Sequence, residues 1–366
     1  MNVVEFRRRT FPPFPWRTAA VLIALIALLV AGVAYVGSQP RLPPPFGLAG
    51  NGLVAYAKDG DILTVDPATG VRRWVTAGNE VDDLPRWSLD GTRLAFLRGT
   101  LPIPIQGSRP AMRVVIVDQD RNVVAESVSI DSIDPDAFAW SPDSRRIAIG
   151  GRALYIMDVG DGGIRVLDVE YEGLDFYWRP NHPSELLFRG GTAAGSGLVL
   201  VDVDRPGSAR LVAADGDEFL RPNGWTPDGE RIFYTRRAPD VDGSAPARTR
   251  ILDVTTGAFV DIDAGYADIS NDGTRFVAID DDGRPCIASI DGGPCVAIAD
   301  SEHAYDGTFA GGTFWAPDDR SIVATRSADL ASPSDDLLLI DPEGRGVGAL
   351  PSWLADGAES WQRVAR

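Results

Sequence analysis

Short stretches in which apolar and polar residues alternate follow one another along most of the chain, separated by clusters of turn-forming residues. One example is ILTVD at 62–66, a PATG turn, and RRWVT at 72–76. Alternation with a period of two residues is the signature of a half-buried β-strand, and Gly, Pro and Asp between strands indicate tight turns. The pattern therefore predicts an all-β protein.

One motif recurs within this pattern: an aromatic residue, Ser or Thr, Pro, Asp and a small residue, followed by a short apolar strand. Two clear copies are WSPDSRRIAI and WTPDGERIFY. Ser or Thr, Pro, Asp and Gly suit the four successive positions of a tight turn, so each copy predicts a strand, a turn and a returning strand. The copies begin at Trp87, Trp140, Trp178, Trp225, Ile269, Trp315 and Trp361.

The interval between copies is about 45 residues, which is the length of one four-stranded propeller blade. The first unit, from Leu53, lacks a Trp strand before it, and the last unit, Ala358 to Val364, is a Trp strand with nothing after it. Pairing these two incomplete ends would close a ring and leave no exposed sheet edge. The sequence predicts a seven-bladed β-propeller over residues 51–366, closed by pairing the C-terminal strand with the N-terminal unit.

The repeated W-[ST]-P-D-G copies resemble the WD40-like (PD40) repeats of the TolB type, which occur in periplasmic and extracellular bacterial propellers. The resemblance covers the whole predicted propeller and implies its fold. Propellers of this kind serve as interaction platforms, as gates on peptidases and as a few enzymes, so the resemblance does not imply one function.

The segment Thr18 to Val36 contains no charged residue. At a rise of about 1.5 Å per residue it would extend about 28 Å, close to the hydrocarbon thickness of a bilayer. Arginines precede it, which favours a cytoplasmic N-terminus. We therefore expect a cytoplasmic tail at 1–17, a transmembrane helix at 18–36 and a proline-rich linker at 37–50.

Two alternatives to an uncleaved anchor stay open. Gly32-Val33-Ala34 could be a signal-peptidase site, and Arg8-Arg9 faintly resembles a twin-arginine signal. All three interpretations export the rest of the chain. The expected location is the cell membrane, crossed once, with the propeller outside the cytoplasm.

The formal net charge of −17 argues against a nucleic-acid surface, which needs Lys and Arg to displace counterions. The acidic residues gather in the predicted links between blades, on the face that also carries the long insertions. Because function often lies in elaborated loops on a rigid scaffold, we expect an acidic binding face around the channel mouth. Its candidate residues are Asp82, Asp83, Asp134, Asp136, Asp175, Glu218, Asp268 and Asp306. The alternative is that these side chains only solubilise loops.

Recognisable catalytic and metal-binding patterns are missing from the sequence. The two histidines, His182 and His303, are too few for a histidine-rich zinc site, and no Gly-x-Ser-x-Gly elbow occurs. Clustered carboxylates could hold Ca²⁺, but no calcium-binding Asp-x-Asp-x-Asp-Gly loop is intact. We expect no cofactor, with Ca²⁺ as the remaining possibility.

Cys286 and Cys295 flank the segment IASIDGGP, a predicted hairpin. Neighbouring antiparallel strands outside the cytoplasm would bring the two thiols together under oxidising conditions. We expect a disulfide, the alternative being two buried thiols.

The combined features favour a membrane-tethered extracytoplasmic interaction or sensing module without catalysis of its own, whose partner is an extracytoplasmic or membrane protein. One alternative is an exported hydrolase or lyase that uses carboxylates of the acidic face. Another is a protein that binds cell-wall glycans or cations. A protein-binding platform should expose aromatic residues on that face, and its candidates are Tyr171, Phe219, Tyr266 and Tyr305.

Overall fold

The computed structural model describes two separate parts of the chain, one within residues 1–41 and one from Leu42 to Arg366. The described residues are 20–29, 42–99, 111–133, 138–238, 247–280, 285–298, 311–327, 335–343, 347–348 and 360–366.

The first part contains one described helix, residues 20–29. Across the described ranges, no helix is both long and apolar enough to cross a membrane. The transmembrane helix that we predicted over 18–36 is therefore wrong for the structure as described.

The second part is an all-β propeller. Its described strands form seven four-stranded antiparallel sheets. Six of the sheets are each built from four consecutive strands, and the remaining sheet has the order β28-β1-β2-β3. The composite sheet pairs Trp361 with Val54, which joins the two ends of the propeller. The fold class is thus corrected to an all-β propeller with six sheets of consecutive strands, one composite sheet and no transmembrane helix in the described chain.

The composite sheet contains β28 (Ser360–Val364), β1 (Gly50–Lys58), β2 (Asp61–Val65) and β3 (Arg72–Trp74). The next two sheets contain β4 (Val81–Trp87), β5 (Arg93–Gly99), β6 (Arg113–Asp118) and β7 (Val123–Glu126), then β8 (Phe138–Trp140), β9 (Arg146–Gly150), β10 (Leu154–Asp158) and β11 (Ile164–Val166).

The fourth and fifth sheets contain β12 (Glu170–Trp178), β13 (Glu185–Thr192), β14 (Gly195–Asp202) and β15 (Arg205–Ala214), then β16 (Phe219–Trp225), β17 (Arg231–Arg237), β18 (Arg248–Asp253) and β19 (Phe259–Ile262). The last two contain β20 (Gly265–Ile269), β21 (Arg275–Ile279), β22 (Pro285–Ser289) and β23 (Val296–Ala297), then β24 (Gly311–Trp315), β25 (Ile322–Ser327), β26 (Asp335–Ile340) and β27 (Val347–Gly348).

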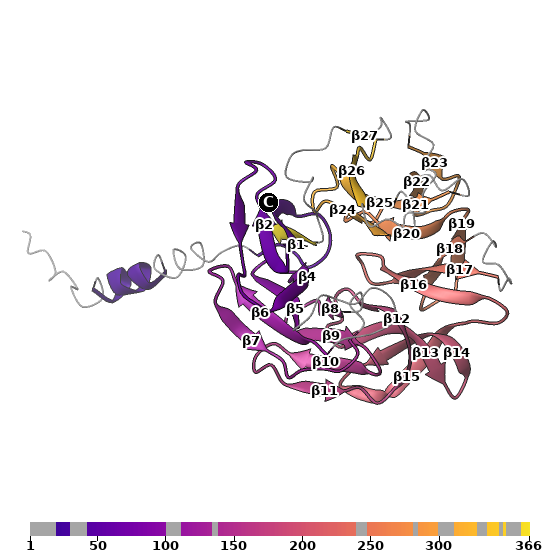
Figure 1. Cartoon of the computed structure of the whole chain (residues 1–366), viewed down its shortest axis with the longest axis horizontal. Helices are drawn as coiled ribbons and strands as arrows, with labels where there is room; N and C mark the ends of the chain where they lie inside the picture. The colour runs from indigo at the N-terminus through magenta and orange to yellow at the C-terminus, as the bar shows by residue number, and fades with distance from the viewer. Residues whose placement is uncertain are drawn as a thin grey trace, which may run out of the picture. The chain divides into compact units, whose positions relative to one another are not determined.

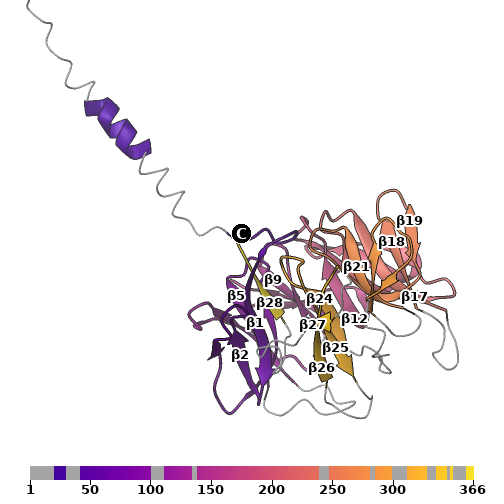
Figure 2. The same ribbon diagram turned by 90° about the horizontal axis from the view of Figure 1, so that it is seen from above.

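The sheets stand around a central axis (Figure 1), and the first strand of each sheet is its innermost strand. Neighbouring innermost strands contact one another, as β12 does with β8 and β16. Figure 2 shows the same sheets from the side, with β28 beside β1 and β25 beside β26. The innermost strands therefore form the wall of a central channel.

The apolar core lies between the sheets rather than at the channel. Each pair of neighbouring sheets encloses one buried cluster; Leu97 and Met112, for example, pack against Trp140 and Ile147 of the next sheet. The last cluster contains Val54 and Tyr56 together with Val323, so the β24–β27 sheet packs on the composite sheet. Burial of apolar surface between every pair of neighbours is the main force that holds the ring together.

The Trp of the motif recurs because its indole joins two neighbouring sheets. Trp140 Nε1 donates a hydrogen bond of 3.0 Å to the carbonyl of Arg86 in the preceding sheet. Trp178 makes the same bond to Ala139 at 3.0 Å, and Trp225 to Tyr177 at 3.3 Å. The acceptor is each time the residue just before the preceding Trp, so the repeat length sets the contact. A buried indole N–H needs such a partner.

The turn after each Trp is closed by its own side chains. Ser141 Oγ donates to Asp143 at 2.7 Å, and the same hydroxyl accepts from the amide of Arg146 at 2.9 Å. Ser270 and Asp272 repeat the first bond at 2.6 Å. These bonds between side chains and the backbone explain why Ser or Thr and Asp recur at fixed spacing. We call the face that carries these turns the lower face and the opposite face the upper face.

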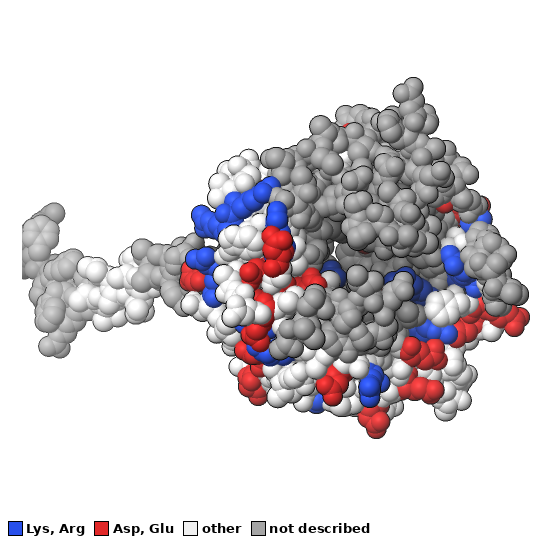
Figure 3. Space-filling view, viewed as in Figure 1, with Lys and Arg blue, Asp and Glu red and all other residues white. Residues whose placement is uncertain are grey.

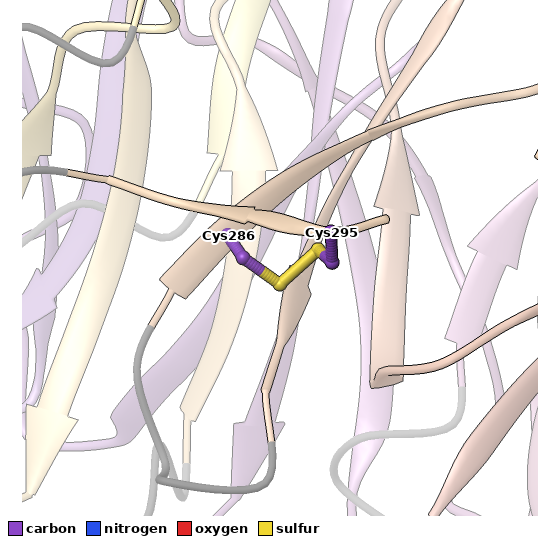
Figure 4. Close-up of a disulfide and its surroundings, with 2 residues drawn as sticks. All are labelled: Cys286 and Cys295. Atoms are coloured by element: carbon purple, nitrogen blue, oxygen red, sulfur yellow. A yellow bond between two sulfur atoms is a disulfide. The ribbon is translucent and has the colours of Figure 1, made fainter. Parts of the chain in front are cut away.

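The predicted disulfide between Cys286 and Cys295 is confirmed. Its Cα atoms lie 5.4 Å apart (Figure 4), and it joins β22 to the segment that leads into β23. The bond thus fastens the outer strand of one sheet to its neighbour.

Candidate functional site

The site begins with irregularities in the innermost strands. In β4 the pairing register shifts between Asp83 and Arg86. Leu84, between them, has a φ of 53°, and its amide donates to Asp83 Oδ1 at 2.8 Å. In β20 the register shifts between Gly265 and Asp268. Bulges re-aim the side chains beside them, and here they precede two polar residues of the channel wall, Arg86 and Asp268.

Two adjoining cavities occupy the channel. The first has a volume of about 360 Å³, and its lining includes Arg86, Asp175 and Tyr177. The second has a volume of about 260 Å³, and its lining includes Asp268 and Arg363. Tyr177 lines both cavities, so they are neighbours. Figure 3 shows the ring hollowed near its centre on the face viewed, with Lys and Arg side chains beside the hollow.

The segment that enters the propeller contributes to this lining. Phe46 lines both cavities. Arg363 holds the segment in place by donating to the carbonyls of Pro44, at 3.3 Å, and Gly47. The same guanidinium donates to Asn271 Oδ1 at 2.6 Å, and burial lowers the Arg363 pKa to about 10. Part of the sequence assigned to the proline-rich linker therefore packs against the propeller.

Tyr177 and Asp268 are the titrating groups of the channel whose pKa values move most. Burial raises the pKa of the Tyr177 hydroxyl, and the Asp175 carboxylate adds to this effect. Burial raises the Asp268 pKa to about 7, although the Ile269 amide donates to Asp268 Oδ1 at 3.0 Å and opposes the shift. A carboxyl group that titrates near neutral pH can exchange a proton with a ligand.

The structure places three of the predicted binding residues in ion pairs with arginine. Asp82 accepts two hydrogen bonds from Arg98, at 2.6 and 2.8 Å, and is 2% exposed. Asp175 accepts from Arg221 Nε at 2.6 Å. Glu218 accepts from Arg236 Nη1 at 3.0 Å.

The other predicted residues have different outcomes. Asp268 makes no ion pair with any residue that the structure describes, and Asp83 holds the bulge of β4. Asp134, Asp136 and Asp306 lie outside the described residues. The structure brings Asp175 and Asp268 to adjoining cavities, while Asp82 and Glu218 lie near the start of β4 and β16. The predicted residues thus do not form one cluster in the described structure.

A group of arginines is the feature that the sequence analysis missed. In four units an arginine follows the motif Trp by eleven residues, since 98 − 87, 189 − 178, 236 − 225 and 326 − 315 all equal 11. Arg189 shows its role most fully. It donates to Asp215 at 2.6 and 2.8 Å, to the Leu220 carbonyl at 3.1 Å, and pairs with Glu172 at 3.0 Å. The constant spacing is the signal that could have revealed these arginines.

No cluster of three or more His, Cys, Asp or Glu side chains suited to a metal ion occurs in the described part of the chain.

No protein-family model matches the chain, and no curated protein matches its sequence. Solved structures with similar folds do exist. One is TolB from Acinetobacter baumannii, 16% identical, with 84% of this chain and 81% of that chain covered and a TM-score of 0.50. A second is an oligogalacturonate lyase from Vibrio parahaemolyticus, 13% identical, with coverages of 83% and 94% and a TM-score of 0.57.

A third is the periplasmic gluconolactonase of Pseudomonas aeruginosa, 13% identical, with coverages of 85% and 98% and a TM-score of 0.55. At these identities the likeness shows the β-propeller fold alone. Because the similar proteins include two named enzymes as well as TolB, the fold does not select one function.

Proposed function

We propose that this protein is an extracytoplasmic interaction module that binds a protein partner through the upper mouth of its channel and has no catalysis of its own. The observation that carries the proposal is the exposure of Phe219, at the start of the innermost strand β16. Its side chain is 46% exposed.

Phe219 is distinguished by its position. The other large apolar side chains that are exposed in the described propeller lie in outer strands, loops or the entering segment, such as Trp74 in β3 and Phe259 in β19. By contrast, Phe138 and Phe176, also on innermost strands, are both 4% exposed. An exposed aromatic side chain at a channel mouth is typical of the centre of a binding surface.

Charged side chains surround Phe219 and are already paired with one another. Arg189 lies over the Phe219 ring, with its Cζ 4.3 Å from the ring centroid, and is held by Asp215. Glu218 is held by Arg236. An apolar centre inside a rim of satisfied polar groups suits a protein interface. Carboxylates fixed in such pairs are poorly placed to remove a proton from a substrate, which favours binding over catalysis.

The disulfide supports a location outside the cytoplasm. Disulfides persist in oxidising compartments and are rare in the cytosol. The structure joins Cys286 to Cys295 within one sheet. The partner that we propose is accordingly an extracytoplasmic protein or the extracytoplasmic part of a membrane protein.

The proposal predicts a position-specific cross-link. A photoreactive phenylalanine analogue at position 219 of the full chain, irradiated in the native cells, should give a discrete adduct with one protein. Phe259 provides the matched control, because it is 54% exposed and also lies under an arginine, with Arg250 Cζ 3.7 Å from its ring centroid. The analogue at 259 should give no such adduct. Mass spectrometry of the adduct identifies the partner.

The identified partner then permits a quantitative test with purified proteins. Phe219→Ser should weaken its binding by at least about tenfold, a typical effect for a central aromatic anchor, whereas Phe259→Ser should leave it unchanged. Equal cross-linking from positions 219 and 259, or an unchanged affinity in Phe219→Ser, would contradict the proposal.

A second candidate function rests on Asp268. Its carboxyl group lines a cavity, has no arginine partner in the described structure, and has a pKa raised to about 7. These properties suit a general acid or base of an exported hydrolase or lyase. A glycan-binding or cation-binding role would use the same channel.

Asp268 predicts a pH dependence of stability. Its folded-state pKa of about 7 lies above its ordinary value of 3.8. Between pH 3.8 and pH 7 the Asp268 carboxyl group is therefore protonated in the folded state and ionised in the unfolded state. The free energy of unfolding that this proton contributes falls as the pH rises towards 7. Asp268→Asn cannot titrate and should not show this fall. The difference in unfolding free energy between variant and wild type should therefore shift by roughly 2 kcal/mol in favour of the variant when the pH is raised from 5 to 8.

Urea unfolding of both proteins at the two pH values measures this gain. An identical pH dependence in wild type and variant would show that Asp268 titrates normally and remove the basis of the catalytic candidate. Hydrolysis or elimination by the wild type on glycoside or lactone substrates, lost in Asp268→Asn, would favour the enzyme over the interaction module.

A further inference from the structure

Arg86 is a cation in the channel for which the described part of the chain offers no hydrogen-bond or ion-pair partner. It is partly buried in the lining of the larger cavity, and its Nε is buried without a hydrogen-bond partner. Within the described structure its guanidinium makes no ion pair; its Cζ lies 6.0 Å from the ring centroid of Phe138, and its charge acts on the Tyr177 hydroxyl. A partly desolvated guanidinium without an acceptor is unfavourable, so the position favours an anion supplied from outside.

Other arginines around the ring differ from Arg86 in the acceptors that their guanidinium groups have. Arg98, Arg189 and Arg236 are each paired with a carboxylate, as described above. Arg363, also buried beside the channel, donates to the carbonyls of Pro44 and Gly47 and to the Asn271 side chain. Among the described residues, these guanidinium groups thus have carboxylate or carbonyl acceptors and that of Arg86 has none, although the Nε atoms of Arg236 and Arg363 are also buried without a hydrogen-bond partner.

The carboxylate that lines the same cavity is already engaged. Asp175 lines the same cavity, but its Oδ2 accepts from Arg221 Nε at 2.6 Å. Arg86 and Arg221 together carry two positive charges against the single charge of Asp175. Among the described residues that line the larger cavity, the positive charge of Arg86 thus has no carboxylate of its own.

The rest of the cavity indicates what kind of anion fits. Phe46 and Phe138 contribute aromatic walls, and Tyr177 contributes a phenol. The volume of about 360 Å³ lies at the lower end of the range for small-molecule sites. A planar carboxylate matches the fork of a guanidinium, and an apolar body matches the aromatic walls.

We propose that the larger channel cavity binds an organic carboxylate with an apolar body, whose carboxylate pairs with the Arg86 guanidinium. The ligand is either a small organic acid or the C-terminal carboxylate of a peptide, which share this chemistry. The site lies in the channel wall and differs from the protein-binding surface around Phe219, so the two proposals can fail independently.

The test is calorimetric titration of the full chain with phenylacetate and with its neutral isostere phenylacetamide. Wild type should bind phenylacetate at least about tenfold more tightly than phenylacetamide, the advantage expected for a charge-assisted pair. Arg86→Gln should remove this preference, and Arg86→Lys should keep part of it. Arg152→Gln, which removes an exposed arginine, is the matched control and should behave as wild type.

The variants should fold, because the bond from Trp140 reaches the Arg86 carbonyl and not its side chain. Thermal unfolding of each variant checks this. Titration with acetyl-Gly-Phe and its C-terminal amide distinguishes the two sources, since tighter binding of the peptide acid than of phenylacetate would assign a peptide terminus. The proposal is overturned if wild type binds neither acid at about 10 mM, binds acid and amide alike, or keeps its preference in folded Arg86→Gln.

Discussion

Replacing Asp82 by alanine is expected to destabilise the propeller by about 3 kcal/mol, the lower end of the range for breaking a buried ion pair. The Asp82 side chain is 2% exposed and accepts two hydrogen bonds from Arg98, at 2.6 and 2.8 Å. Removing the carboxylate leaves the guanidinium with Glu80 at 3.9 Å, a poor substitute on a partly exposed side chain. The unfolding free energy from urea titration measures the loss.

Asp263→Ala is the matched control. Its carboxylate also lies 2.6 Å from an arginine Nε, that of Arg248, but the side chain of Asp263 is 83% exposed. An exposed pair contributes about 0–1 kcal/mol, because water screens it in both states. Similar losses in the two variants would show that burial does not set the contribution of these ion pairs to stability.

The partners of the acidic residues could not be predicted from the sequence. The repeat predicted the turns and the strands correctly because its Ser, Asp and Trp form bonds within one turn or with the neighbouring sheet. The acidic links were interpreted from composition alone, as a negatively charged surface. Their partners, such as Arg98 for Asp82 and Arg236 for Glu218, lie sixteen and eighteen residues away on another strand. Strand pairing brings these charges together, and strand pairing cannot be read from the composition.

The channel site was still less predictable. Arg86 and Asp268 face the channel because bulges shift the register of β4 and β20. A one-residue shift sends a side chain to the opposite face of a strand, and the alternation pattern cannot locate it. Arg363 comes from the last strand and Phe46 from the segment before the first. Their proximity depends on how the two ends of the propeller meet.

The N-terminal error has a simpler physical origin. Hydrophobicity and length predicted a helix over 18–36, whereas the described helix covers 20–29. Hydropathy and length indicate an apolar helix, and neither fixes the residues at which a helix begins and ends.

The largest expected effect on stability concerns β28, the strand that joins the two ends of the propeller. Gly91 closes the turn after Trp87, with a φ of +69°, and its carbonyl accepts from Gln362 Nε2 at 2.7 Å. A Cβ at this position would lie 2.0 Å from the Arg363 carbonyl oxygen of β28. Gly91→Ala should therefore add a backbone clash of about 3 kcal/mol to a conformational cost of about 1 kcal/mol, about 4 kcal/mol in all.

Gly70→Ala separates these two contributions. Gly70 has nearly the same φ, +70°, but a Cβ there would meet nothing within 4 Å. It should lose only the conformational part, about 1 kcal/mol. Hydrogen exchange at 360–364 should accelerate in Gly91→Ala and stay unchanged in Gly70→Ala, because the clash acts on the strand that joins the ends. If the two variants lose equal stability, β28 moves aside without cost, and the pairing of β28 with β1 contributes little to holding the ring closed.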